Sequence, residues 1–151
     1  MPDIEVSKIV NAPADRVWAI LTDLEGSEFI VSGIESVEVL SGDDMFGVGT
    51  RWRETRKMMG REATEEMEVT AIDPGRSYTV EADNHGAHYT SGMAVTDIGD
   101  GKSRLTMTFE AEANTTGGKL MVGAAKLFKG ATRKAIQQDL EDIAAAAEQL
   151  S

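Results

Sequence analysis

The stretch that decides the fold of this chain reads IVNAPADRVWAILTD over residues 9–23. Its β-branched start predicts the end of a strand. Pro13 then lies where a helix can begin, because its fixed φ suits the first turn and its missing N–H is not needed there. Val17, Trp18 and Leu21 follow at helical spacing. We therefore expect a strand that leads directly into an amphipathic helix.

The charge of the chain excludes several classes of partner. Its 15 basic and 26 acidic side chains give a formal net charge of −11. Phosphate backbones and anionic lipid headgroups repel such a surface, so we expect no nucleic-acid partner and no stable membrane insertion. No apolar run reaches the roughly 20 residues that cross a bilayer, and the N-terminus lacks the features of a signal peptide. The expected location is the cytoplasm.

The absence of cysteine removes a second group of functions. The 151 residues include no cysteine, so disulfides, thiolate nucleophiles and zinc–thiolate sites are excluded. No glycine-rich phosphate loop follows a predicted strand, and we expect no cofactor. The length suits a single domain over residues 1–151 with its own hydrophobic core.

Hydrophobic periodicity and turn residues divide the chain into short elements. The opening strand and helix are expected at about 3–11 and 13–23, followed by a short helix or turn region over about 24–32. Turn residues such as Asp73-Pro74-Gly75 separate a series of strands. These strands are expected at about 34–42, 49–58, 61–73, 76–84, 87–98 and 103–114. One long helix is expected over about 117–150.

The charges predict the register of the hairpin formed by the strands at 49–58 and 61–73. One register places opposite charges across from each other on one face: Arg51 with Glu68, Arg53 with Glu66, and Lys57 with Glu62. The same register sets Trp52 opposite Met67 on the other face, which should be the inner one. A slip of one residue would lose this match.

This register also makes Glu54 and Glu65 direct neighbours on the Trp52 face. Like charges that face each other are destabilising, unless Arg56 bridges them, solvent reaches them or one carboxyl stays protonated. In one interpretation, this end of the hairpin extends past the core into water. In the other, the two carboxyls form a polar group at the rim of a pocket.

The expected C-terminal helix carries one continuous apolar stripe. The stripe consists of Met121, Ala125, Phe128, Thr132, Ile136, Leu140, Ile143, Ala147 and Leu150. Gly123 and Gly130 weaken the first half of this helix, each by about 1 kcal/mol relative to Ala. The segment is either a core helix that tolerates two glycines or a helix whose first half bends as a lid.

Several segments resemble the START-like (SRPBCC) superfamily, which includes the Bet v allergen, polyketide cyclases and lipid-transfer proteins. Besides the opening stretch, these segments are GTRWRE at 49–54, AIDPGR at 71–76, GDGKSRLT at 99–106, LFKG at 127–130 and LEDI at 140–143. Together they cover nearly the whole chain. They are most similar to the bacterial polyketide cyclase/dehydrase-like branch.

The resemblance implies an α+β fold of the helix-grip type. A curved antiparallel sheet of about seven strands would wrap around the long C-terminal helix, with two short helices after the first strand. Members of the superfamily bind lipids, polyketides, quinones or aromatic molecules in an apolar cavity between sheet and helix. The family has no universal catalytic residue, so the resemblance assigns none here.

Strand alternation selects the side chains that would line such a cavity. The chain has eight methionines, whose flexible side chains suit an adaptable binding surface as well as a filled core. The candidate ligand-binding residues are Trp52, Met67, Tyr78, Met93, Leu105, Met107, Phe109, Met121, Ala124 and Phe128.

The polar candidates are fewer. His85 and His88 are the two histidines of the chain. A pair at this spacing falls short of the three or four ligands of a metal site, so we expect no metal. The candidate catalytic residues are Glu54, Glu65, His88 and Tyr89, with Tyr78 as a further polar residue of the pocket.

These features favour a carrier or sensor of a small hydrophobic molecule, either monomeric or dimeric. The lack of a recognisable catalytic set supports a binding protein over an enzyme. One alternative is an aromatase/cyclase-type or dehydratase-type enzyme that works without a metal and uses the polar pocket residues. Another is a protein-interaction module like the chaperone activators of the same superfamily, which predicts a closed cavity and an exposed apolar patch.

Overall fold

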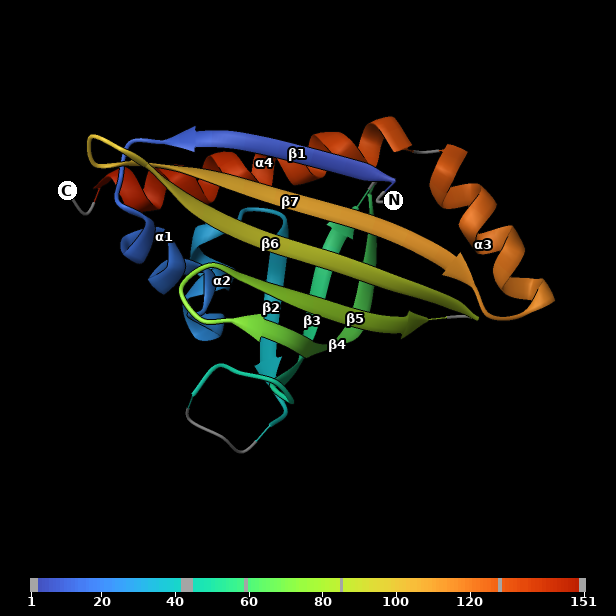
Figure 1. Cartoon of the computed structure of the whole chain (residues 1–151). Helices are drawn as coiled ribbons and strands as arrows, with labels where there is room; N and C mark the ends of the chain where they lie inside the picture. Colours follow the sequence, from blue (N-terminus) through green and yellow to red (C-terminus); the bar gives the residue numbers. More distant parts are fainter. Residues whose placement is uncertain (1–2, 42–44, 59, 85, 128, 150–151) are drawn as a thin grey trace.

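The computed structural model describes residues 3–41, 45–58, 60–84, 86–127 and 129–149, which form an α+β fold (Figure 1). All predicted strands and both short helices after the first strand are present. In chain order the elements are β1 (Ile4–Val10), α1 (Ala14–Leu21), α2 (Leu24–Ile30), β2 (Ile34–Val39), β3 (Arg51–Met58), β4 (Arg61–Asp73), β5 (Ser77–Asn84), β6 (Ala87–Gly99), β7 (Lys102–Ala113), α3 (Thr116–Leu127) and α4 (Lys129–Gln149).

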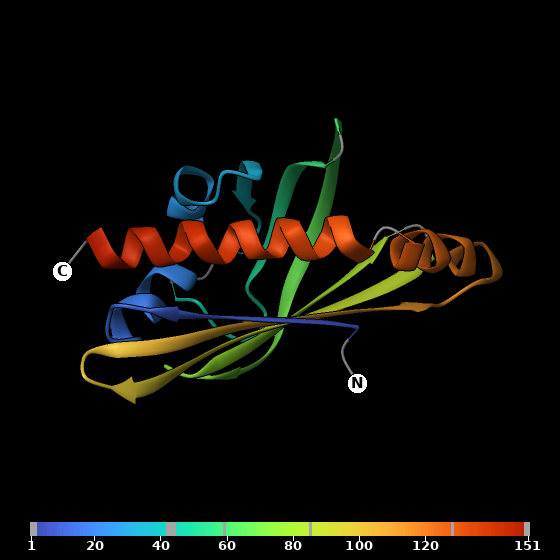
Figure 2. The ribbon, with the colours of Figure 1, turned by 90° about the horizontal axis from the view of Figure 1, so that it is seen from above.

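The strands form one seven-stranded antiparallel sheet in the order β1-β7-β6-β5-β4-β3-β2. The pairing register shifts between Val69 and Ala71 and between Asp97 and Gly99, and such bulges increase the local twist. Figure 2 shows that β2, β3 and β4 turn strongly away from the direction of β1 and β7, and that α4 lies across one face of the sheet. We call this face the inner face and the opposite one the outer face.

The β3–β4 register is the one that the charges predict. Every predicted pair is present, from Arg51 with Glu68 at one end to Lys57 with Glu62 at the other. Trp52, which alternates with the charged side chains of β3, is 5% exposed and belongs to the hydrophobic core. The charge pattern therefore fixes which side chains of this hairpin reach the inner face.

The opening stretch forms the predicted strand–helix unit. β1 ends at Val10, and Pro13 precedes α1 as its N-cap residue with a φ of −68°. Val10 and Val17 have no exposed surface. The Ser103 hydroxyl of β7 donates a hydrogen bond to the Ala12 carbonyl at 2.9 Å, which ties the connection between β1 and α1 to the sheet.

The C-terminal segment differs from the prediction of one helix over 117–150. It forms two helices, α3 and α4, that point in different directions (Figure 1). The reason is that the two halves pack on different partners: α3 contacts β6 and β7, whereas α4 contacts β1, α1 and α2 as well as β7. A Cβ on Gly118 of α3 would collide with the Gly86 carbonyl, so this glycine allows α3 to dock at the β5–β6 turn.

Candidate functional site

Most of the predicted ligand-binding residues meet on the inner face. Tyr78, Met93 and Met107 form one row across β5, β6 and β7, because each is the register partner of the next. Trp52 and Met67 are register partners on β3 and β4 and pack with the same hydrophobic core. Residues distant in sequence are thus brought to one surface.

Burial divides these residues into two groups. Trp52, Tyr78 and Leu105 are buried. The other group is apolar, packs against the core and is only half-buried: Met67, Met93, Met107 and Phe109. Of the remaining predicted residues, the side chains of Met121 and Ala124 and the whole of Phe128 lie outside the described part of the chain.

Aromatic rings gather at the buried group. The ring centroid of Phe46 lies 4.9 Å from that of Tyr78, with the planes 70° apart, and 6.4 Å from that of Trp52. Trp18 of α1 meets Tyr78 edge-on at 5.9 Å. Such pairs add about 0.5–1.5 kcal/mol each beyond the burial of their surface. The cluster joins α1 and the loop before β3 to the inner face.

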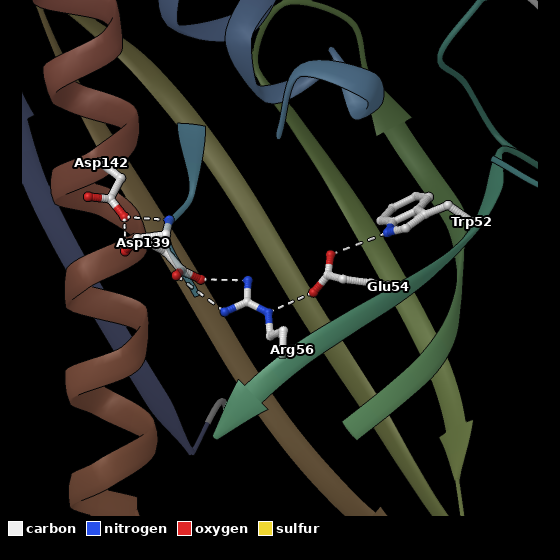
Figure 3. A network of polar contacts seen from close by, with 6 residues as sticks. Trp52, Glu54, Arg56, Asp139 and Asp142 are labelled. Carbon is white, nitrogen blue, oxygen red and sulfur yellow. Dashed lines mark hydrogen bonds and ion pairs between the residues drawn. The ribbon is translucent and has the colours of Figure 1, made fainter. Parts of the chain in front are cut away.

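A buried polar network joins β3 to α4 (Figure 3). The Arg56 Nε donates to Glu54 Oε2 at 2.7 Å, and its Nη1 and Nη2 donate to the two carboxylate oxygens of Asp139 at 3.2 and 2.8 Å. The Trp52 Nε1 donates to the other oxygen of Glu54 at 3.4 Å. Glu54 and Asp139 are 8% and 5% exposed. One guanidinium therefore serves two buried carboxyls.

The predicted neighbours Glu54 and Glu65 lie opposite each other on β3 and β4. Glu65 is half-buried and Glu54 is buried, so the interpretation that this end of the hairpin extends past the core into water is wrong for Glu54. Of the three ways in which the like charges could be tolerated, the bridge from Arg56 is present at Glu54. The ion pair with Arg56 compensates the charge of Glu54 directly.

Burial and charge compete within the network. Burial acts to lower the pKa of Arg56, but the charges of Glu54 and Asp139 outweigh it and hold this pKa above its ordinary value. Burial raises the pKa of Asp139, although Arg56 donates hydrogen bonds to it. Burial, together with the charge of Glu54, also raises the pKa of Tyr78. The Tyr78 hydroxyl therefore keeps its proton at neutral pH.

Asp142 extends these contacts to the connection between α2 and β2. Its Oδ2 accepts hydrogen bonds from the backbone N–H and the hydroxyl of Ser32, at 3.0 and 2.9 Å. Burial acts to raise the pKa of Asp142, but these bonds and one from Gln138 lower it below the ordinary value. The next residue, Gly33, packs so close that a Cβ would lie 3.3 Å from Arg56 Nη1.

His88 lies on the outer face, whereas its neighbour Tyr89 lies on the inner face and stacks on Phe109 at 5.8 Å. The two ring nitrogens of His88 lie 2.7 Å from Asp83 Oδ1 and 2.8 Å from Glu81 Oε1. These hydrogen bonds raise the pKa of His88, because an imidazolium can donate from both nitrogens. The candidate catalytic residues are thus divided between the two faces.

The structure also bears on metal binding. Among the described residues, no group of three or more His, Cys, Asp and Glu side chains is arranged to hold a metal ion. The candidate ligand His85 lies outside the described residues.

Comparison with known proteins places this architecture in a family. The model of the polyketide cyclase/dehydrase and lipid transport family matches residues 1–148. The chain belongs to this family. No curated protein sequence matches the chain.

Several solved structures share the fold of this family member. A protein from Thermus thermophilus superposes with a TM-score of 0.79 at 20% identity, over 98% of each chain. The Zhui aromatase/cyclase from a Streptomyces species gives 0.78 at 23% identity, over 97% of this chain and 93% of that one. A START superfamily protein from Mycobacterium smegmatis gives 0.77 at 13% identity, over 98% of each chain.

Two acidic residues of the site in this family member are not among the residues that the sequence predicts. Asp139 and Asp142 both lie on α4, and Asp139 is as buried as the apolar residues around it. A signal was present, because Asp139 follows Ile136 by three positions and precedes Ile143 by four, which places it on the apolar face.

None of the described helices is long and apolar enough to cross a membrane.

Proposed function

We propose that this family member binds a small apolar molecule on its inner face and serves as a carrier or sensor of it. The observation that carries the proposal is the half-buried state of four apolar side chains on that face: Met67, Met93, Met107 and Phe109. A solidly filled core would bury them completely. Covering their remaining surface with a ligand would contribute roughly 25 cal/mol per Å².

The residues of this face suit ligands of varied shape. Three of the four half-buried side chains are methionines, whose unbranched thioethers adapt to irregular apolar surfaces. Ser91 is also half-buried and lies opposite Phe109 in the register of β6 and β7. We expect a ligand to cover the part of the half-buried Phe109 ring that this short side chain does not cover.

A pair of matched variants tests this proposal with the fluorescent apolar probe N-phenyl-1-naphthylamine. Ser91→Phe adds a large ring to the inner face, whereas Thr90→Phe adds the same ring one residue earlier, on the outer face. We expect saturable binding of the probe by the wild type and Thr90→Phe, and at least tenfold weaker binding by Ser91→Phe. Equal affinity of both variants, or no saturable binding by the wild type, would contradict the proposal.

A second candidate function is a metal-free cyclase or dehydratase, which the position of Glu54 favours. This carboxylate is buried on the inner face, and its charge acts on the Tyr78 hydroxyl. The pair offers a proton acceptor beside a proton donor. Glu65 and Tyr89 lie on the same face, and His88 does not.

The cyclase hypothesis is tested with a poly-β-ketone thioester mimic, whose loss is followed by chromatography and mass spectrometry. Glu54→Gln removes the proton acceptor, and Glu66→Gln makes the same change in net charge on the outer face of β4. Faster loss with the wild type and Glu66→Gln than with Glu54→Gln would support an enzyme. If the thioester is lost at the same rate in buffer and with the wild type and both variants, this chain does not catalyse the reaction of this substrate class.

A further inference from the structure

The polar network on the inner face holds more acidic than basic groups. Arg56 lies 2.7 Å from a Glu54 oxygen and 2.8 Å from an Asp139 oxygen, and the two acidic side chains are 9% and 7% exposed. With both carboxyls ionised, the network has one excess negative charge away from water. A buried charge is costly unless a partner compensates it. Burial and, to a smaller extent, the charge of Glu54 raise the pKa of Asp139.

Tyr78 adds a second polar group to the buried part of the inner face. The side chain is 9% exposed, and among the described residues no group hydrogen-bonds its hydroxyl. In the described part of the chain, two side-chain polar atoms are fully enclosed and lack a hydrogen-bond partner. They belong to Arg16 and Ser41, and the Tyr78 hydroxyl is not among them. The hydroxyl oxygen carries lone pairs, so it can accept a hydrogen bond from a cationic donor.

Tyr89 contributes an aromatic ring to the same inner face. Burial and the charge of Glu65 raise the pKa of Tyr89, whose ring stacks on Phe109 with an interplanar angle of 23°. Aromatic faces attract cations, most strongly when both are shielded from water. Carboxylates and aromatic faces together are the groups that bind an ammonium ion.

We infer that the inner face prefers molecules whose apolar body carries a protonated amine over alcohols and carboxylic acids with the same body. The inference rests on the proposed function, because it assumes that an apolar body binds there. The ammonium group would donate hydrogen bonds to Glu54 and to the Tyr78 hydroxyl and would compensate the excess charge. The body would cover Met93 and Met107.

Three molecules that share a twelve-carbon chain test this preference: dodecylamine, 1-dodecanol and dodecanoate. Each competes with N-phenyl-1-naphthylamine below its aggregation concentration at pH 7. We expect dodecylamine to bind at least about tenfold more tightly than dodecanol, because a hydrogen bond to a charged partner is about twice as strong as a neutral one. Dodecanoate should bind most weakly, since its charge has the same sign as the excess charge.

Two isosteric variants separate the site from the acidic surface. Glu54→Gln and Glu66→Gln change the net charge equally, but Glu54 lies on the inner face and Glu66 on the outer face, next to Arg53. In about 0.3 M salt, which screens surface charges over a few ångströms, Glu54→Gln should lose the preference for the amine and Glu66→Gln should keep it. Tyr78→Phe, which keeps the ring, should reduce the preference severalfold.

The outcomes separate this inference from the proposed function. If none of the three molecules displaces the probe and the wild type does not bind the probe, the proposed function fails. If the molecules bind but the amine is not preferred, or if Glu66→Gln removes the preference as strongly as Glu54→Gln, apolar binding stands and the inference is overturned. Should Glu54→Gln fail to fold, the wild-type ranking and Tyr78→Phe still decide.

Discussion

Replacing Arg56 by methionine should destabilise the protein more than any surface charge substitution. Methionine keeps most of the apolar length of the side chain but removes the guanidinium. Glu54 and Asp139, whose side chains are 9% and 7% exposed, then remain buried without their cationic partner. Removing one partner of a buried ion pair costs about 3–5 kcal/mol. This is a large part of the roughly 5–15 kcal/mol by which a domain is stable.

The matched control is Arg53→Met, which makes the same change on the outer face of the same strand. Arg53 contacts Glu38 at 3.0 Å and Glu66 at 2.8 Å, but its side chain is 42% exposed. Solvent screens such pairs, and their loss costs at most about 1 kcal/mol. Urea unfolding at pH 7, followed by far-UV circular dichroism, gives the free energy of unfolding of both variants.

Acidification should narrow the difference between wild type and Arg56→Met. Without the hydrogen bonds and charge of Arg56, burial raises the folded-state pKa of Asp139 further above its unfolded value. The folded variant then binds a proton at Asp139 more tightly than the unfolded chain, so its stability recovers as the pH falls through the folded-state pKa of Asp139. A loss below about 1 kcal/mol at pH 7, or no dependence of the difference on pH between 7 and 4, would refute a buried charge network.

Two further predictions concern the glycines of α3 and the histidine on the outer face. Gly118→Ala should lower the free energy of unfolding by about 1–3 kcal/mol, because the added Cβ collides with the Gly86 carbonyl. At Gly123 no atom lies within 4 Å of an added Cβ, so Gly123→Ala should raise the free energy of unfolding by up to about 1 kcal/mol. A more stable Gly118→Ala than Gly123→Ala in thermal unfolding would contradict the docking of α3. His88, whose pKa is raised, should contribute stability below its unfolded pKa of about 6.5 that is lost as the pH rises through the folded pKa. His88→Gln should therefore give a flatter stability profile between pH 6.5 and 8.5, and an unchanged profile would refute this contribution.

The sequence was sufficient for the β3–β4 hairpin because the information that sets its register is local. The charges of residues 51–68 permit one register, and Trp52 opposite Met67 identifies the inner face. The opening stretch carries its own helix signal in Pro13. Strand alternation also predicts that His88 lies on the outer face. The inner-face residues of its strand, Met93 among them, have odd numbers, whereas His88 has an even number.

The remaining features depend on contacts between residues that are far apart in sequence. The apolar stripe continues through residues 117–150, so periodicity gives no sign that α3 and α4 separate. The separation follows from the approach of Gly118 to Gly86. Likewise, the partners Arg56 and Asp139 are 83 residues apart. Phe46 joins the aromatic cluster from a loop, where no periodicity marks it.

The most direct test of the central claim is to observe where an apolar ligand binds. Methyl NMR of the protein labelled at its methionine methyl groups, with 1-dodecanol as the ligand, reports on Met67, Met93 and Met107 of the inner face. Met45, which is 83% exposed in the loop before β3, serves as the internal control. We predict saturable shifts at the three inner-face methionines and none at Met45. Shifts confined to Met45, or no saturable shift at the inner face, would contradict ligand binding between the sheet and α4.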